Sequence, residues 1–109
     1  MGKAFMLVQD DTATQVKATV YRDRNTIADL TGATVRLYFR KKRTKELIGT
    51  LLNRSSVEQQ QQGIAIFKFE AEHLDGEKGM YEGEVEVTYL DGGIETVYNI
   101  IDFYLREDF

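Results

Sequence analysis

Residues 74–91 read LDGEKGMYEGEVEVTYLD, and this stretch decides the expected fold. From residue 81 onward, apolar side chains alternate with glutamates, which is the period-two pattern of a strand with one buried face. Tyr81 follows a short turn, where immunoglobulin-like sandwiches carry a tyrosine whose hydroxyl bonds to the upstream backbone. Gly83 stands where an antibody domain has its second cysteine. The stretch therefore predicts the central strand of a small β-sandwich.

Further strands are predicted on both sides of this one. They are residues 5–8 at a sheet edge, 15–21, 33–40, 46–52, 64–69, 94–98 and 100–106. The connections are predicted turns at 22–25 and 91–93, a basic loop at 40–45, a mobile glutamine-rich loop at 53–63 and a short helical turn at 71–74. Because no long helical pattern competes, the sequence predicts an all-β fold. We expect an immunoglobulin-like antiparallel β-sandwich of about seven to eight strands with one short helical turn.

Strand alternation also assigns the two faces of each strand. The expected core residues are Val16, Ala18, Val20, Leu30, Val35, Leu37, Phe39, Ala65, Phe67, Phe69, Ile101, Phe103 and Leu105. If the strand at 33–40 neighbours the Tyr81 strand, the outward Arg36 and Arg40 lie near Glu82, Glu84 and Glu86. Such cross-strand ion pairs contribute about 0.2 to 1 kcal/mol each.

Composition limits the possible classes of protein. The 109 residues fit one domain, residues 1–109, with a core that needs no metal or disulfide. There is no cysteine, so thiolate chemistry and zinc-thiolate sites are excluded. The net charge of −4 argues against nucleic-acid binding. We expect no membrane segment, since no run of about 18 apolar residues occurs, and no signal peptide, since Met1 to Val8 lacks a basic start followed by a long apolar segment.

Residues suited to catalysis or metal binding are sparse. His73, the one histidine, falls in the predicted helical turn without a serine or cysteine partner, and we interpret it as a solvent-exposed turn residue. Glu82, Glu84 and Glu86 could form a carboxylate pair for glycoside hydrolysis or a calcium site, but their position as neighbours on one strand face favours a solvated or ion-paired surface. Residues 40–45 could touch phosphate, yet a solvated loop or a protein contact fits the acidic total better. We therefore predict no enzyme activity, no cofactor and no metal.

Outward apolar residues are the more informative set. If residues 65, 67 and 69 fill the core, the isoleucines beside them face outward, where a monomer normally places polar groups. The candidate partner-binding residues are Ile64, Ile66, Tyr21, Tyr38, Tyr98 and Tyr104. Together they indicate a binding or assembly module.

The chain resembles a known family in its motifs. Gln9-Asp10-Asp11-Thr12, an alternating strand and then ADLTGATVR at 28–36 are similar to the N-terminal immunoglobulin-like domain of the phage baseplate upper protein family. GMYEGEV at 79–85, followed by Asp91-Gly92 and a closing strand, resembles the second half of that domain. Family members are virion structural proteins that attach tail fibres or receptor-binding proteins. Larger members continue into a long fibre-like extension, so the resemblance implies a small tail, baseplate or head-to-tail accessory protein without catalytic residues.

Two functional hypotheses follow, and a third is weaker. The first is a non-enzymatic phage structural or assembly protein that is made in the host cytoplasm and resides in the virion. It would contact other virion proteins or copies of itself in a multimeric assembly. The alternative is a carbohydrate-binding module for host-surface glycans, with Tyr21, Tyr38, Tyr98 or Tyr104 as stacking platforms. Hydrolase activity is the third hypothesis, and it requires two carboxylates about 5 to 9.5 Å apart in a cleft.

Overall fold

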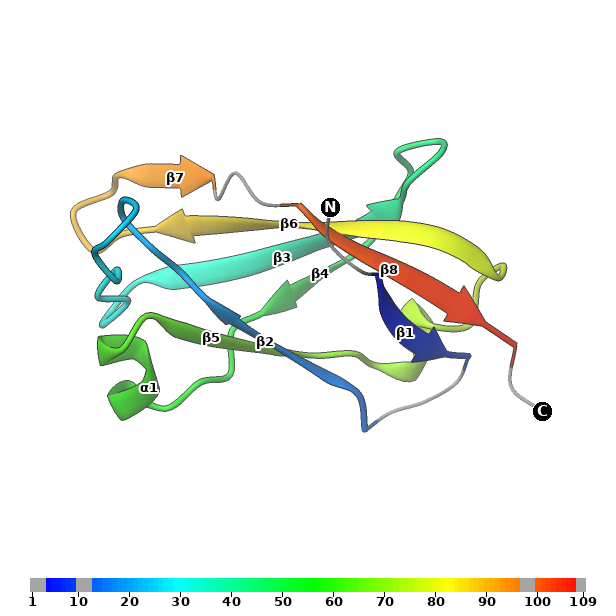
Figure 1. Ribbon diagram of the computed structural model, residues 1–109, viewed down its shortest axis with the longest axis horizontal. Helices are drawn as coiled ribbons and strands as arrows, with labels where there is room; N and C mark the ends of the chain where they lie inside the picture. The colour runs from blue at the N-terminus through cyan, green and yellow to red at the C-terminus, as the bar shows by residue number, and fades with distance from the viewer. Residues whose placement is uncertain (1–3, 10–12, 97–99, 108–109) are drawn as a thin grey trace.

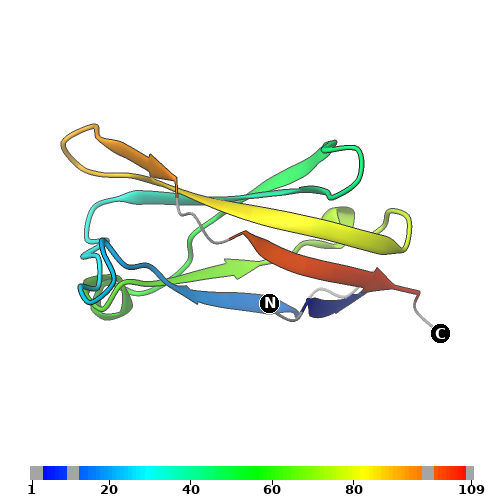
Figure 2. The same ribbon diagram turned by 45° about the horizontal axis from the view of Figure 1, so that its top comes forward.

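The computed structural model describes residues 4–9, 13–96 and 100–107 (Figure 1). Eight strands lie in these ranges: β1 (Phe5–Val8), β2 (Gln15–Thr19), β3 (Thr34–Lys41), β4 (Leu47–Leu52), β5 (Ile64–Lys68), β6 (Gly79–Thr88), β7 (Ile94–Thr96) and β8 (Ile101–Arg106). Two short helices, α1 (Val57–Gln61) and the 3-10 turn η1 (Ala71–His73), accompany them. The predicted all-β sandwich is confirmed, and its two sheets face each other as layers (Figures 1 and 2).

The larger sheet is built around β6, as the opening stretch of sequence predicts. Its order is β1-β8-β6-β3-β4, and β7 also pairs with β6. The second sheet consists of β2 and β5. The expectation of a fully antiparallel sandwich is wrong at one place, because β1 runs parallel to β8, with Phe5 opposite Phe103.

The core lies between the sheets and is formed by the residues that the alternation assigns to it. Phe39 is at the centre of an aromatic cluster: its ring centroid lies 5.0 Å from Phe69, 5.1 Å from Tyr81 and 5.5 Å from Phe103. Tyr81 stacks on Phe39, whereas the two other rings meet Phe39 edge to face. Because Phe69 follows β5, these contacts join the small sheet to the large one. Ala18 and Ile101 depart from the expectation, since each is only half-buried.

Gly83 allows β6 to approach its neighbours in this core. A Cβ atom at this position would lie 2.7 Å from Leu37 Cδ1 and 3.0 Å from Phe103 Cε2. The first distance is too short for two carbon atoms and the second is tight, so an added side chain would require the Leu37 and Phe103 side chains to move within the packed core. At the position where an antibody domain carries a cysteine, packing against Leu37 and Phe103 therefore favours glycine.

The glutamine-rich segment at 53–63 is more regular than a mobile loop. It contains α1, which begins with a capping box: Gln59 N donates to Ser56 Oγ at 3.2 Å, and Ser56 N donates to Gln59 Oε1 at 2.9 Å. Side-chain caps of this kind satisfy the free amide groups of a first helical turn. Neither described helix has the length and apolar character needed to span a membrane.

Candidate functional site

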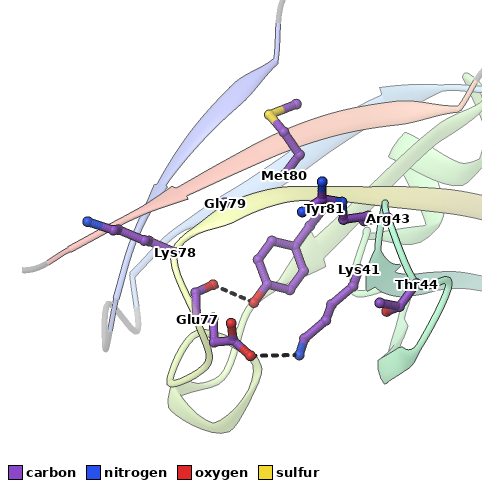
Figure 3. Close-up of a pocket in the computed structure, with 8 residues that line it drawn as sticks. All are labelled: Lys41, Arg43, Thr44, Glu77, Lys78, Gly79, Met80 and Tyr81. Atoms are coloured by element: carbon purple, nitrogen blue, oxygen red, sulfur yellow. Dashed lines mark hydrogen bonds and ion pairs between the residues drawn. The ribbon is translucent and has the colours of Figure 1, made fainter.

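Tyr81 forms the tyrosine corner that its position predicts. Its side chain points from β6 into the core, and its hydroxyl donates a 2.6 Å hydrogen bond to the main-chain oxygen of Glu77 (Figure 3). Burial raises the pKa of the phenol, so the hydroxyl remains a donor at physiological pH. The corner is therefore a structural element, which fixes the turn ahead of β6.

A shallow pocket of about 340 Å³ lies beside this corner (Figure 3). Lysine and arginine side chains stand around it, but the ammonium groups already have carboxylate partners. Lys41 Nζ lies 3.4 Å from Glu77 Oε1, and Lys78 Nζ lies 3.1 Å from Glu107 Oε1. The pocket is lined by Lys41, Arg43, Thr44, Glu77, Lys78, Gly79, Met80 and Tyr81. These residues include no histidine, cysteine or serine, and the Tyr81 hydroxyl is already bonded to the main-chain oxygen of Glu77.

Glu82 is the most buried charged group of the described residues. It is only 2% exposed, and it accepts hydrogen bonds from Arg40 Nε at 2.6 Å and Lys45 Nζ at 3.0 Å. Burial raises the pKa of the carboxyl group, but the two cationic donors outweigh it, and the net pKa is below the ordinary value. The expected ion pairing with Arg40 is confirmed, whereas a solvated position is wrong for this residue.

The remaining glutamates of β6 also serve the sheet. Glu84 lies 3.8 Å from Arg40 Nη2, and Glu86 accepts a 3.0 Å hydrogen bond from the hydroxyl of Tyr38. Arg36 stands opposite Glu86 in the β3–β6 register, as expected from the sequence. Because each carboxylate faces a cation or a hydroxyl of β3, their arrangement is that of an ion-paired sheet surface.

An apolar row crosses three strands on the outer face of the large sheet. Met6 of β1 and Met80 of β6 both stand opposite Tyr104 of β8 in the strand register. Their sequence neighbours Leu7, Tyr81 and Leu105 are buried, so the row faces away from the core. Met6 is 59% exposed, Met80 is 41% exposed and Tyr104 is half-buried. We call these three residues the Met6–Tyr104–Met80 row.

Charged pairs stand next to this row. Lys42 Nζ lies 3.0 Å from Asp102 Oδ1, and Asp102 precedes Tyr104 by two positions on β8. The ion pair between Lys78 and Glu107 lies at the end where β6 begins. An apolar centre with a polar rim is the usual composition of a protein–protein contact surface.

The predicted partner-binding residues are spread over different surfaces. Ile64 and Ile66 are half-buried on β5, opposite Thr19 and Lys17 of β2. Tyr21 is exposed beyond the end of β2, where it bridges to Ile27. Tyr104 lies in the apolar row, and Tyr98 lies outside the described residues.

Tyr38 and Tyr104 do not lie next to each other. Tyr38 pairs with Glu84 and Tyr104 with Met80, which are four positions apart on β6 and therefore separated by about 13 Å. The methionines of the row are not among the residues that the sequence predicts for partner binding. The alternation along each strand predicts that these methionines point outward, but no local pattern predicts the parallel pairing of β1 with β8.

His73 is a structural residue, although it is not an exposed one. It is half-buried, its Nδ1 accepts a 3.0 Å hydrogen bond from Glu70 N, and its ring contacts Phe69 edge to face at 6.3 Å. The imidazole thereby caps η1. Within residues 4–9, 13–96 and 100–107, no three His, Asp or Glu side chains are grouped so that they could hold a metal ion.

Comparison with known proteins gives a likeness at the level of the fold. No protein-family model matches the chain, and no curated protein does. Among solved structures, the chain is similar to CopC from Methylosinus trichosporium OB3b, with a TM-score of 0.55 and 11% sequence identity. The similarity covers 99% of this chain and 88% of CopC. It extends over the whole sandwich and agrees with the all-β architecture.

Proposed function

We propose that this protein is a non-enzymatic binding module that acts through protein–protein contacts. The observation that supports this function best is the Met6–Tyr104–Met80 row, in which three large side chains from three strands lie side by side and face solvent. Methionine and tyrosine are enriched in protein interfaces, because the thioether adapts to irregular surfaces and the phenol combines an apolar ring with a polar tip. A protein surface that covers this row would remove it from water.

The electrostatics of the large sheet support the same function. The carboxylates of β6 accept hydrogen bonds from Arg40, Lys45 and Tyr38, so this face offers a partner polar groups that are already held in place. Lys42–Asp102 and Lys78–Glu107 can supply rim contacts without leaving an unpaired charge at the centre.

The partner class that we propose is a structural protein of a phage virion. This part of the proposal rests on the sequence resemblance of residues 28–36 and 79–85 to the phage baseplate upper protein family. The chain would then be a small tail, baseplate or head-to-tail accessory protein. Neighbouring genes for tail and baseplate proteins would support this assignment, and a metabolic operon around the gene would overturn it.

The experiment compares incorporation of tagged variants into purified particles of the phage that carries the gene. The variant Met6→Glu/Met80→Glu introduces two charges into the row, and Leu90→Glu is the matched control at an exposed position beyond β6. We expect the wild type and the control to co-purify with particles and the double variant to be lost, with all three equally folded by circular dichroism. A wild type that is absent from particles overturns the virion assignment. Equal retention of the double variant overturns the row as the contact surface.

A further inference from the structure

Two connections between strands meet at the end of the sandwich where β6 finishes. They are the β2–β3 connection at residues 20–33 and the β6–β7 turn at residues 89–93 (Figures 1 and 2). In antibody variable domains, the connections at one end of the sandwich form the binding surface. Met80 and Tyr89 are nine positions apart along β6 and its continuation, so this end lies about 30 Å from the Met6–Tyr104–Met80 row.

Buried residues and backbone hydrogen bonds hold the β2–β3 connection in place. Ala28 and Leu30 are fully buried. Ala28 N donates to Val20 O at 2.9 Å. Leu30 N donates to Gln60 O, also at 2.9 Å. The polar side chains of this connection therefore stand on a fixed backbone.

The β6–β7 turn is held in the same way and packs against that connection. Tyr89 N donates to Gly93 O at 2.8 Å, and Gly92 N donates to Tyr89 O at 2.9 Å. Leu90 lies over Gly32 of the other connection, where an added Cβ atom would be 3.4 Å from Leu90 Cδ1. The two connections therefore form one surface that exists before any ligand binds.

A pocket of about 330 Å³ lies between the two connections. Its volume falls within the range of small-molecule binding sites. The pocket is lined by Arg22, Asp29, Thr31, Tyr89, Leu90 and Asp91. It does not include three of the residues that the sequence predicts as stacking platforms, Tyr21, Tyr38 and Tyr104.

Each aspartate of this pocket has one oxygen fixed by its own turn. Asp29 Oδ1 accepts hydrogen bonds from Thr31 N at 3.0 Å and Thr31 Oγ1 at 2.6 Å, and Asp91 Oδ1 accepts one from Gly93 N at 2.8 Å. The Oδ2 atoms have no hydrogen-bond partner within residues 4–9, 13–96 and 100–107. The hydrogen bonds from Thr31 hold the pKa of Asp29 below its ordinary value, so this carboxylate is an ionised acceptor at neutral pH.

Arg22 supplies hydrogen-bond donors to the same pocket. Its guanidinium forms no ion pair with an acid in the part of the chain that the structure describes. A guanidinium only donates and a carboxylate only accepts, whereas a hydroxyl group does both. Neighbouring hydroxyl groups of one ligand can therefore satisfy the arginine and the two aspartates together.

The charges of the pocket select an uncharged ligand. Asp29 and Asp91 would repel an anion, and Arg22 would repel a cation. Among the described residues, the two aspartates are not grouped with a third His, Asp or Glu that could complete a metal site. Leu90, which is 84% exposed, and the half-buried Tyr89 add apolar surface. A saccharide combines neighbouring hydroxyl groups with an apolar ring face, and it matches both features.

We propose that this pocket binds a neutral saccharide, whose hydroxyl groups donate to Asp29 and Asp91 and accept from Arg22. Leu90 and Tyr89 contact the C–H face of the sugar ring. Because the pocket and the apolar row lie at opposite ends of β6, this inference does not depend on the proposed function.

Nuclear magnetic resonance titration of the full chain, labelled with ¹⁵N, tests the proposal. The probes are glucose, galactose, mannose and N-acetylglucosamine, each up to about 50 mM, with acetate and ethylammonium as charged comparisons. We expect at least one saccharide to shift the amide signals of Thr31, Leu90 and Asp91 saturably, with a Kd of about 10 mM or below. If none of the four saccharides does so, or if only a charged probe does, the proposal is overturned.

Matched substitutions test the polar groups. Asp29→Asn keeps an oxygen for the turn but replaces the other acceptor by a donor, and Arg22→Met removes the guanidinium. Each should weaken saccharide binding by about tenfold, so that the shifts no longer approach saturation. The controls are Asp23→Asn and Arg24→Met, since Asp23 also holds its own turn by accepting backbone hydrogen bonds and neither residue lines the pocket. Wild-type binding by either pocket variant would overturn the site.

A variant of the apolar row separates this inference from the proposed function. Met6→Glu/Met80→Glu should bind saccharides like the wild type, although it is expected to be lost from particles. If this variant is folded and no longer binds saccharides, the pocket is not the binding site. If Asp29→Asn does not fold, as judged from its amide spectrum, Asp91→Asn takes its place with the same expected loss.

Discussion

The hydroxyl of Tyr81 and the main-chain oxygen of Glu77 are 2.6 Å apart, and this hydrogen bond ties the turn before β6 to the aromatic core. The ring of Tyr81 stacks on Phe39, so the same side chain contributes to the core through its ring and holds the turn through its hydroxyl. A phenylalanine would preserve the ring contact and leave the carbonyl without this donor.

We therefore expect Tyr81→Phe to lower the free energy of unfolding by about 0.5 to 1.5 kcal/mol, the net value of a buried hydrogen bond. Urea denaturation followed by circular dichroism measures it. Tyr89→Phe is the matched control, since the Tyr89 hydroxyl donates to the exposed Glu95 at 2.9 Å. The control should change stability by less than about 0.5 kcal/mol. Equal effects of the two substitutions would show that the corner has no special role.

Gly83→Ala tests the close approach of β6 to its neighbours. The added methyl group would meet Leu37 and Phe103 at distances that the core cannot accept without movement. We expect the free energy of unfolding to fall by about 1 to 3 kcal/mol, which thermal unfolding would show as a lower midpoint. Glu84→Ala, next to it on the outer face, should have a much smaller effect. An unchanged midpoint for Gly83→Ala would mean that the sheet relaxes freely at this point.

We expect the free energy of unfolding to depend on pH through the buried carboxylate of Glu82. Because its folded-state pKa lies below the ordinary value of 4.5, its contribution is fully present above that value. The contribution is lost as the pH falls through the lower, folded pKa. At pH 7, Glu82→Gln should reduce the free energy of unfolding by about 1 to 3 kcal/mol, since Arg40 and Lys45 lose a charged acceptor. The difference in free energy of unfolding between this variant and the wild type should become progressively smaller below pH 4.5.

The matched control for this series is Glu58→Gln, an exposed residue of α1. Its stability should follow that of the wild type at every pH. Chemical denaturation at a series of pH values between about 2 and 8 makes the comparison. If the difference in free energy of unfolding between Glu82→Gln and the wild type stays constant down to the lowest pH of the series, the role assigned to the buried carboxylate is contradicted.

Alanine substitution of the two adjacent serines before α1 should affect stability differently. Ser56 Oγ accepts the hydrogen bond from Gln59 N, so Ser56→Ala should cost about 1 kcal/mol. Ser55 Oγ is buried and has no hydrogen-bond partner among the described residues, so Ser55→Ala should be neutral or slightly stabilising. Thermal unfolding of both variants checks the pair, and a larger loss for Ser55→Ala would contradict it.

The features that sequence alone predicted depend on local pattern. The alternation around Tyr81 and the turn chemistry before and after it determine β6, its buried face and the tyrosine corner. The ion pair between Arg40 and Glu82 was also predictable, because one assumption about strand neighbours puts these outward residues in register. In each case the period-two alternation indicates directly which face of the sheet a side chain occupies.

The features that were missed depend on partners distant in sequence. The sequence predicts a loop where α1 forms, because the Ser56–Gln59 capping box is a weak signal inside a polar run. The apolar row requires β1 and β6 to flank β8, a register that no local pattern contains. The burial of Glu82 likewise follows from Lys45, which reaches back across the β3–β4 turn.

The parallel pairing of β1 with β8 also decides how the domain would bear tension. Force applied through the segments before Phe5 and after Arg106 would pull the two strands in opposite directions along their own length. Their hydrogen bonds would then be sheared together, whereas a hairpin pulled at its open end separates bond by bond. A sandwich with this connection between its first and last strands is suited to stand in series within a loaded assembly.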